Sequence, residues 1–177
     1  FNKNNMKNLA QVIGFQPKEN AKDIYIKKYS SGYSIEIDFD KKTFHFGGKI
    51  KIQGKDFQNI TKPEDWVVLE CVNRLLEKGY KPENISLEKV YPAGHGFSGR
   101  LDICVTREDG SEYLLIECKT YGREFEKEFT RIKKDGGQLF TYFKFSNKAD
   151  IIMLYASDLK GKDIIYKNEI VKIEDDY

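Results

Sequence analysis

Two carboxylates and a lysine stand in a pattern that can hold a metal ion and activate water. Asp102 lies in one apolar, β-rich run, Glu117 and Lys119 lie in the next, and Asp109 and Gly110 stand between the runs. An Asp-Gly pair between two such runs is a strong signal for a β-hairpin with a two-residue loop. In that register Asp102 lies directly opposite Glu117, where facing Cβ atoms are about 4.5–5.5 Å apart and like charges repel. The pair therefore needs a compensating cation.

The chemistry that this pattern favours is metal-assisted hydrolysis. Mg²⁺ binds one or two carboxylates together with carbonyl oxygens and water, so it would relieve the repulsion between Asp102 and Glu117. Lys119 lies two residues beyond Glu117 and projects to the same face of the strand. A lysine beside a metal-bound water can orient that water and stabilise the charge that develops on a phosphate. The opposite face of the hairpin is predicted to be core, and its facing pairs are Ile103 with Ile116 and Val105 with Leu114.

Three motifs together resemble a known nuclease family. Leu101-Asp102 followed by Glu117-Cys118-Lys119 resembles the PD-(D/E)xK nuclease motif, with leucine in the place of the usual proline. The segment from Lys62 to Tyr80 is similar to the first core helix of the nuclease domain found at the N-terminus of type I restriction enzyme R subunits and of related restriction–methylation fusions. Gln138 and Tyr142 carry the Q-x-x-x-Y signature of the following helix. The resemblance covers residues 62–157.

The resemblance implies a function and a set of partners. It implies an endonuclease domain of a restriction–modification system, which hydrolyses phosphodiester bonds of double-stranded DNA with Mg²⁺, for which Mn²⁺ can substitute. The expected partners besides DNA are motor, methylase or recognition domains or subunits of the same system. Two rivals stay open: a Holliday-junction resolvase or repair nuclease, and a DNA-binding module without cleavage activity. The complete acid-acid-lysine set argues against the module.

The resemblance also assigns roles to individual residues. The metal ligands would be Asp102, Glu117 and the carbonyl group of Cys118. Lys119 would position the attacking water, and Gln138 would orient the groups around it. In many relatives an acid on the first core helix also reaches the metal. The candidates here are Glu64, Asp65 and Glu70, among which the sequence does not choose, and each can instead be a solvated surface charge.

Two further side chains are candidates for contact with DNA. Tyr142 lies four residues beyond Gln138 and therefore on the same helical face, where it supports DNA contact or packs in the core. Arg100 lies beside Asp102, where it contacts a phosphate or is simply exposed. Six lysines near the N-terminus form either a basic DNA-facing surface or a solvated sheet edge; they are Lys27, Lys28, Lys41, Lys42, Lys49 and Lys51.

The order of the helices and strands that must position these residues predicts an α/β fold. Residues 61–177 follow the order helix, three strands, helix, strand of restriction-endonuclease-like domains, in which helices flank a mixed sheet. Residues 1–60 are predicted to form an N-terminal β-rich extension, an antiparallel meander of strands 24–29, 33–39 and 43–53 after a short helix at 8–13. Gly47-Gly48 is expected to form a bend or bulge within the last strand. The core elements are expected at 61–79, 84–91, 99–106, 113–120, 138–145 and 150–155, with a polar loop or helix start at 121–134. A terminal hairpin of strands 163–166 and 169–173, turned at Lys167 and Asn168, would follow.

Composition limits the classes of protein that fit. The chain has 177 residues, of which 33% are charged and 40% hydrophobic, so it is globular, and its net charge of +2 does not by itself indicate nucleic acid binding. The chain has three cysteines, and none of them form a C-x-x-C pair. An odd number of cysteines without such a pair indicates free thiols in a reducing compartment. No apolar run has the length of a membrane span. We therefore expect a cytoplasmic protein with no membrane contact.

Overall fold

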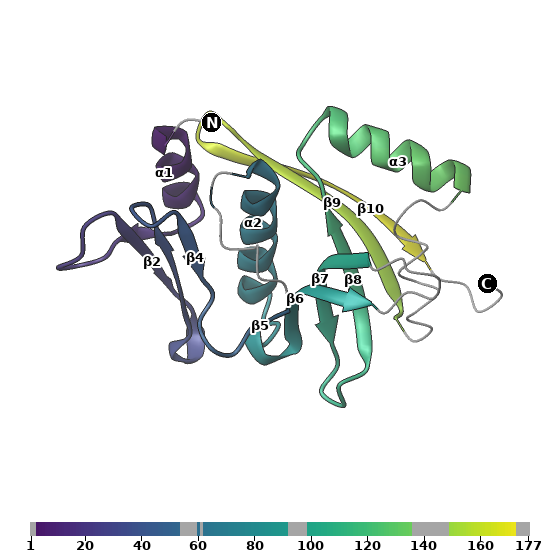
Figure 1. Cartoon of the computed structure of the whole chain (residues 1–177), viewed down its shortest axis with the longest axis horizontal. Coiled ribbons are helices and arrows are strands. Elements are labelled where there is room, and N and C mark those ends of the chain that lie inside the picture. Colours follow the sequence, from purple (N-terminus) through teal and green to yellow (C-terminus); the bar gives the residue numbers. More distant parts are fainter. Residues whose placement is uncertain (1–2, 54–59, 61, 92–98, 136–148, 173–177) are drawn as a thin grey trace.

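Two β-sheets and three α-helices make up the part of the chain that the computed structural model describes, which is residues 3–53, 60, 62–91, 99–135 and 149–172. A four-stranded sheet has the order β1-β2-β3-β4, and a six-stranded sheet has the order β10-β9-β8-β7-β6-β5. The helix α2 lies between the two sheets, and α3 lies at the far side of the six-stranded sheet (Figure 1). The predicted α/β class, with a mixed sheet flanked by helices, is confirmed.

The N-terminal elements form the antiparallel meander that the sequence predicts, but its last strand is shorter. The sheet begins after a helix that is longer than predicted, and Lys51–Ile52 leaves it to pair in parallel with the six-stranded sheet. The stretch 43–53 is therefore two strands in two different sheets, and the bend predicted at Gly47 and Gly48 separates them. Gly47 has a φ of +74°, which favours glycine. The elements are α1 (Lys3–Val12), β1 (Gln16–Pro17), β2 (Ile24–Lys28), η1 (Ser30–Gly32), β3 (Ser34–Asp38), β4 (Thr43–His45) and β5 (Lys51–Ile52).

The remaining elements have the predicted order of helix, three strands, helix and strand. β6, β7 and β8 are antiparallel neighbours, and β9 lies beside β8 in the parallel direction. The charged stretch after residue 121 is a helix, α3, rather than a loop, and the helix expected at 138–145 lies outside the described residues. The elements are α2 (Pro63–Glu77), η2 (Pro82–Asn84), β6 (Ile85–Tyr91), β7 (Gly99–Thr106), β8 (Glu112–Cys118), α3 (Arg123–Asp135), β9 (Ile151–Lys160) and β10 (Asp163–Lys172).

The predicted terminal hairpin is wrong. β10 is one continuous strand along β9, and Lys167 and Asn168 lie in its middle, paired with Ala156 and Tyr155. The turn comes earlier, at Gly161, whose φ is +65°. A Lys-Asn pair in a β-rich run resembles a turn, but β10 is the edge strand of the six-stranded sheet, where polar residues are well tolerated.

The hairpin of β7 and β8 has the predicted body and a different loop. Ile103 pairs with Ile116 and Val105 with Leu114, as predicted. The N–H of Arg107 donates to the carbonyl of Ser111, however, so the loop has three residues, Glu108-Asp109-Gly110. Gly110 has a φ of +86°, which a three-residue loop of this type requires. A register shift between Val105 and Thr106 compensates for the extra loop residue and restores the pairing toward the site.

Two apolar cores cover the two faces of the six-stranded sheet. The larger core joins both sheets through α2, whose Val68, Leu69 and Val72 are almost fully buried. The smaller core lies under α3 and includes Phe125 and Ile132. The division of the chain into residues 1–60 and 61–177 stays a prediction, although apolar residues of both segments share the larger core.

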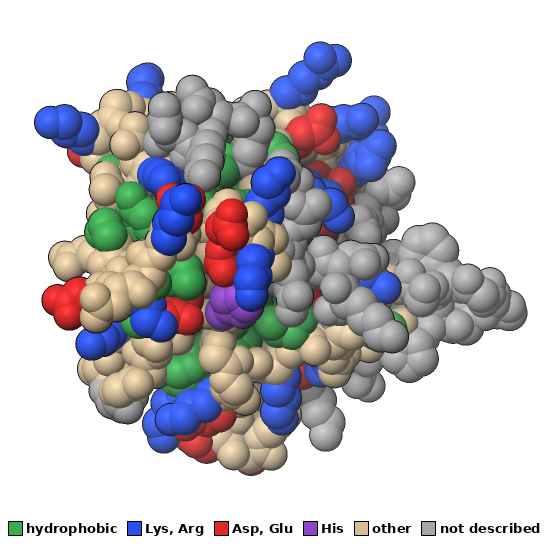
Figure 2. Space-filling view, turned by 60° about the vertical axis from the view of Figure 1, so that its left-hand side comes forward, with side chains coloured by type: hydrophobic (Ala, Val, Ile, Leu, Met, Phe, Trp, Pro, Cys, Tyr) green, Lys and Arg blue, Asp and Glu red, His purple; other side chains and the backbone are tan. Residues whose placement is uncertain are grey.

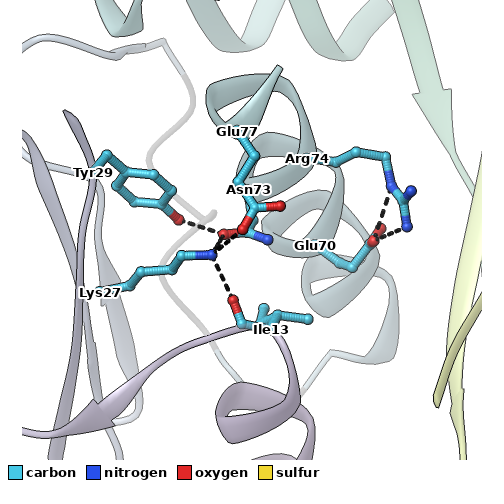
Figure 3. A network of polar contacts seen from close by, with 7 residues as sticks. All are labelled: Ile13, Lys27, Tyr29, Glu70, Asn73, Arg74 and Glu77. Atoms are coloured by element: carbon cyan, nitrogen blue, oxygen red, sulfur yellow. Dashed lines mark hydrogen bonds and ion pairs between the residues drawn. The ribbon is translucent and has the colours of Figure 1, made fainter. Parts of the chain in front are cut away.

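A polar network anchors the N-terminal sheet to α2 (Figure 3). The ammonium group of Lys27 on β2 donates to the carbonyl oxygen of Ile13 at 2.6 Å and to Oδ1 of Asn73 at 2.7 Å. It also forms an ion pair with Glu77. The hydroxyl of Tyr29 donates to the same Asn73 oxygen at 2.7 Å. Because the Lys27 side chain is only 13% exposed, these bonds lie at a largely dry junction between β2 and α2.

Among the described residues, no helix combines the length and the apolar character that crossing a bilayer requires.

We expect Lys27→Met to lower the free energy of unfolding by about 1–3 kcal/mol, because it leaves the Ile13 carbonyl and one Asn73 bond without the lysine donor. Chemical denaturation followed by circular dichroism measures the change. Lys28→Met is the matched control, since Lys28 is exposed on the same strand and should change stability by about 0.5 kcal/mol or less. Equal losses in the two variants would mean that the network contributes nothing specific.

Candidate metal centre

The candidate site forms where the alternation of β7 reverses. Residues two apart on a regular strand project to the same face, yet Leu101 belongs to the core under α3 and Ile103 belongs to the core around α2. Asp102 lies between them, at the reversal. Its Oδ2 accepts a hydrogen bond of 2.8 Å from the backbone N–H of Cys118 on β8. This bond fixes the carboxylate against the neighbouring strand.

Three carboxylates converge here from three elements. Asp102 comes from β7, Glu117 from β8 and Glu64 from the first turn of α2, and one oxygen of each lies within 4.8 Å of the others. The pairing of Ile103 with Ile116 one step away explains how the hairpin brings Asp102 and Glu117 together. Asp102 and Glu117 thus lie close together, as predicted, and Glu64 adds a third acid from a helix.

Lys119 reaches the same cluster from the end of β8. Its backbone N–H donates to the carbonyl oxygen of Tyr155 at 2.9 Å, which ties this position to β9. Its Nζ lies 3.8 Å from Oε1 of Glu117. The side chain is 20% exposed, so the ammonium group is held beside the carboxylates and still meets solvent.

Burial and like charge raise the pKa of the strand acids. Burial raises the pKa of Asp102 to about 7, although the hydrogen bond from Cys118 opposes the shift. Burial, and then repulsion by Asp102, raise the pKa of Glu117 well above its ordinary value. For Lys119, burial acts to lower the pKa, but the surrounding carboxylates, Glu117 foremost, outweigh it and raise the pKa. The cluster therefore favours positive charge and disfavours full ionisation of its acids.

The residues of the cluster fit a divalent cation. Oε2 of Glu117 is buried and has no hydrogen-bond partner among the described residues. An unsatisfied carboxylate oxygen in a buried place is unfavourable. A hard cation with oxygen ligands would satisfy this atom and would screen the repulsion among Glu64, Asp102 and Glu117. The carbonyl of Cys118 as a further ligand stays a prediction.

The structure chooses among the three acids of α2. Glu64 lies in the cluster. Glu70 lies outside the cluster and instead accepts hydrogen bonds from the Tyr155 hydroxyl at 2.6 Å and from the Arg74 guanidinium at 2.8 Å. Asp65 is only 8% exposed. The expectation of solvated surface charges is therefore wrong for Asp65 and Glu70, because both carboxylates are buried.

The basic residues considered for DNA contact differ in their placement. Arg100 is 54% exposed, and its Nη1 lies 3.6 Å from Oε2 of Glu88. Lys27 points inward to α2 and cannot belong to a basic surface. Figure 2, which turns the N-terminal sheet forward, shows lysine and arginine side chains interspersed with acidic ones on that face. Its charge is mixed, and the alternative of a solvated lysine-bearing surface fits it better than a continuous basic one.

Some predicted residues lie outside the described part of the chain, and some described residues were not predicted. Gln138 and Tyr142 belong to the first group, so their roles stay predictions. Glu128 belongs to the second: it is 4% exposed on α3, and its charge helps to raise the pKa of Lys119. Glu128 falls in the apolar stripe of Phe125, Phe129 and Ile132, a spacing that could have marked it as buried. Glu88, the ion-pair partner of Arg100, was also not predicted, and the spacing of apolar residues around it does not mark it as partly buried.

A family model places these residues in a known family of sequences. The model described as the N terminus of the type I restriction enzyme R protein matches residues 63–162, which is more than half of the chain. The match contains Glu64, Asp102, Glu117 and Lys119. No curated protein matches the chain.

In the metal-free protein, we expect Asp102→Asn to raise stability at pH 8. The pKa of Asp102 is about 7 in the folded protein against an ordinary 3.8. The folded state therefore binds an extra proton between pH 4 and pH 7, and stability falls as pH rises through this window. The amide removes that loss, which is worth at most about 4 kcal/mol. Denaturant titrations in EDTA between pH 4.5 and pH 8 measure the difference between variant and wild type.

A residual slope is expected in Asp102→Asn, because burial also raises the pKa of Asp65 to about 7. Asp163→Asn, on the exposed start of β10, is the control and should follow the wild type. An Asp102→Asn protein that loses more stability than the wild type between pH 5 and pH 8 would contradict the assignment.

Proposed function

The chain belongs to the family of the N-terminal domain of type I restriction enzyme R proteins, and we propose on this premise that it is a DNA endonuclease domain of a restriction–modification system. Its reaction is the hydrolysis of phosphodiester bonds in double-stranded DNA. Its cofactor is Mg²⁺, and Mn²⁺ can substitute for it. The domain works with motor, methylase or recognition parts of the same system.

One observation carries this proposal. Carboxylate oxygens from Glu64, Asp102 and Glu117 lie within 4.8 Å of one another, with the ammonium group of Lys119 3.8 Å from Glu117. Oxygen ligands of this kind are what Mg²⁺ prefers, and a lysine at the rim adds a fixed positive charge. Binding alone would not require a lysine beside the metal ligands, so the complete set favours cleavage over a DNA-binding module.

The residues divide into those that hold the ion and those that act on the substrate. Glu64, Asp102 and Glu117 would hold Mg²⁺, and the bound ion would polarise a phosphoryl oxygen and acidify a water. The ammonium of Lys119 orients the attacking water and donates to a phosphate oxygen as negative charge develops there. Gln138 orients the same groups, as the family resemblance implies. The hydrogen bond from Cys118 keeps Asp102 aimed at the ion.

DNA contact is assigned to side chains around this centre. Arg100, half exposed on β7 near the site, contacts a backbone phosphate and exchanges its ion pair with Glu88 for that contact. Tyr142 supports DNA contact beside Gln138. A junction resolvase or a repair nuclease would need the same metal site, but the family match favours the restriction system.

We expect Asp102→Ala to abolish both metal binding and cleavage, whereas Lys119→Ala abolishes cleavage and keeps most of the metal affinity. Asp102 is a ligand of the ion, while Lys119 acts on water and phosphate. Plasmid cleavage with Mg²⁺ or Mn²⁺ measures the reaction, and calorimetric titration with Mn²⁺ measures binding. Equal losses of Mn²⁺ affinity in the two variants would make Lys119 structural. Wild-type cleavage by Asp102→Ala would refute the proposed site.

We expect Glu64→Gln to weaken Mn²⁺ binding about 10-fold and to slow cleavage at fixed metal concentration, because it removes one of three charged ligands. Excess Mn²⁺ should then restore part of the rate. Glu83→Gln is the control, since Glu83 is exposed in η2 and outside the cluster. An unchanged affinity in Glu64→Gln would leave Glu64 as a neighbour of the site rather than a ligand.

A further inference from the structure

The outer edge of β10 is long and regular, and no described strand pairs with it. β10 is the last strand of the six-stranded sheet, and all of its residues pair with β9 without a register shift. Proteins usually interrupt or bend such an edge, because its free N–H and C=O groups can pair with another strand. β10 contains neither a proline nor a bulge. Within the described part of the chain, this edge is therefore available to a further strand.

The turn between β9 and β10 determines which backbone groups of β10 point outward. Gly161 and Lys162 form a two-residue loop, and Gly161 has the positive φ, +65°, that such hairpins use. The residues that flank this loop, Lys160 and Asp163, exchange both hydrogen bonds, and every second pair after them does the same. The odd-numbered residues of β10 are therefore bonded to β9. The even-numbered residues direct their N–H and C=O groups to the outer edge; they include Ile164, Tyr166, Asn168 and Ile170.

Two of these residues also expose large apolar side chains. Tyr166 is 52% exposed and Ile170 is 55% exposed, the highest fractions among the large apolar residues of the described part of the chain. They lie four residues apart and therefore on the same face of the strand. On that face the guanidinium carbon of Arg74 lies 4.1 Å from the centre of the Tyr166 ring. A strand added beside β10 would cover both exposed side chains.

The sequence of β10 complements itself about Asn168. Two antiparallel copies of a strand in one sheet are related by a two-fold axis perpendicular to the sheet, and facing residues project to the same side, so one residue faces its own copy. With the axis at Asn168, Tyr166 faces Ile170 of the second copy. Lys167 faces Glu169 of the second copy. The first pair is apolar and the second has opposite charges, and pairs of both kinds stabilise neighbouring strands.

The neighbouring registers put like charges together. With the axis at Lys167 two lysines face each other, and with the axis at Glu169 two glutamates do. Like charges that face each other destabilise a strand pair. Within its own chain Lys167 forms an ion pair with Glu126 of α3, but its side chain is still 42% exposed and can meet a second acid. The register about Asn168 is therefore preferred over the registers on either side.

We propose that two copies of the chain associate through β10, antiparallel with the two-fold axis at Asn168, so that their six-stranded sheets join into one. The partner is a second copy because the edge offers facing pairs for its own sequence on both faces of the strand. Pairing satisfies the outward N–H and C=O groups and covers Tyr166 and Ile170. One strand pair with its side chains is a small interface, so the dissociation constant is on the order of 10–100 μM.

This dimer carries its two candidate metal centres on one side. A two-fold axis perpendicular to the joined sheet leaves equivalent faces of the two copies together. Glu117 on β8 is level with Leu154 on β9, and Leu154 is level with Glu169 on β10, one residue from the axis. Five strand spacings therefore separate Glu117 from its copy, which is about 24 Å. Any use of the paired centres on the two strands of DNA rests on the proposed function, but association is measured without DNA or metal.

Analytical ultracentrifugation of the 177-residue chain in EDTA, from about 5 to 500 μM, tests the inference. We expect a wild-type dimer that Asn168→Pro weakens at least about 10-fold, because proline removes an outward N–H and leaves the bonds to β9 in place. Val12→Ser is the control, since Val12 is an exposed apolar residue of α1 and should leave the dissociation constant unchanged. Circular dichroism confirms that each variant folds.

A charge-reversal pair tests the register. Glu169→Lys puts a lysine opposite Lys167 of the second copy, and Lys167→Glu puts a glutamate opposite Glu169, so each should weaken the dimer about 10-fold. The double variant restores opposite charges across the axis and should recover most of the wild-type affinity. These exposed substitutions supply the test if Asn168→Pro does not fold.

The outcomes separate this inference from the proposed function. A wild-type chain that stays monomeric at every concentration would overturn the dimer, and so would a dimer that the β10 variants leave unchanged. A dimer that both single charge variants weaken and the double variant does not restore would overturn the register about Asn168. A dimer that neither binds Mn²⁺ nor cleaves DNA would overturn the proposed function and leave this interface intact. Recovery in the double variant would support the pairing of β10 with its own copy.

Discussion

Carboxylate oxygens of Glu64, Asp102 and Glu117 lie within 4.8 Å of one another, where their negative charges repel, and the surrounding structure has to hold them there. Left to themselves such acids would move apart or bind protons, and the raised pKa of both strand acids records this tendency. Two features oppose it: the backbone hydrogen bond from Cys118 to Asp102 and the nearby ammonium of Lys119. The arrangement of the site therefore favours binding of a cation, and without a cation it lowers the stability of the folded protein.

The helix α2 is the element that keeps these mutually repelling acids in place. Its first turn supplies Glu64 and Asp65, while its middle is fixed to β9 by the bond between Glu70 and the Tyr155 hydroxyl. Asn73, farther along, takes part in the Lys27 network that anchors the helix to the N-terminal sheet. Apolar residues of α2 fill the larger core on both sides. A helix held at its middle and its end can keep acids at its beginning in an unfavourable place, because displacing them would break contacts elsewhere.

The sequence could predict those parts of the site that depend on strand register and on local spacing. Pairing of Ile103 with Ile116 follows from apolar alternation, and it alone brings Asp102 and Glu117 together. The loop was predicted less well, since a three-residue turn and a register shift produce the same pairing as a two-residue turn. The prediction of a turn in β10 failed for a related reason. Lys167 and Asn168 are residue types that are common in turns, but an edge strand also accepts polar residues.

The third acid of the cluster and the positive φ of Glu88 could not be predicted, for a different reason. Choosing Glu64 over Asp65 or Glu70 requires the rotation of α2 about its axis, and all three acids are compatible with an amphipathic helix. Reversal of faces at Glu88 depends on a positive φ that tertiary contacts impose on a residue with no preference for it. Alternation in the sequence of β6 therefore gives no sign that residues before and after Glu88 face different cores.

The N-terminal segment bears on the site although it lies outside the family match. The match begins at residue 63, the first residue of α2, and includes the three carboxylates of the candidate metal centre. Lys27, Tyr29 and Ile13 precede it, yet they contact the helix that presents Glu64. Residues of α1 and β3 complete the same core as α2. The candidate site thus lies within the matched span, while the contacts that keep this acid-rich helix turn in place come partly from the N-terminal sheet that precedes it in the chain.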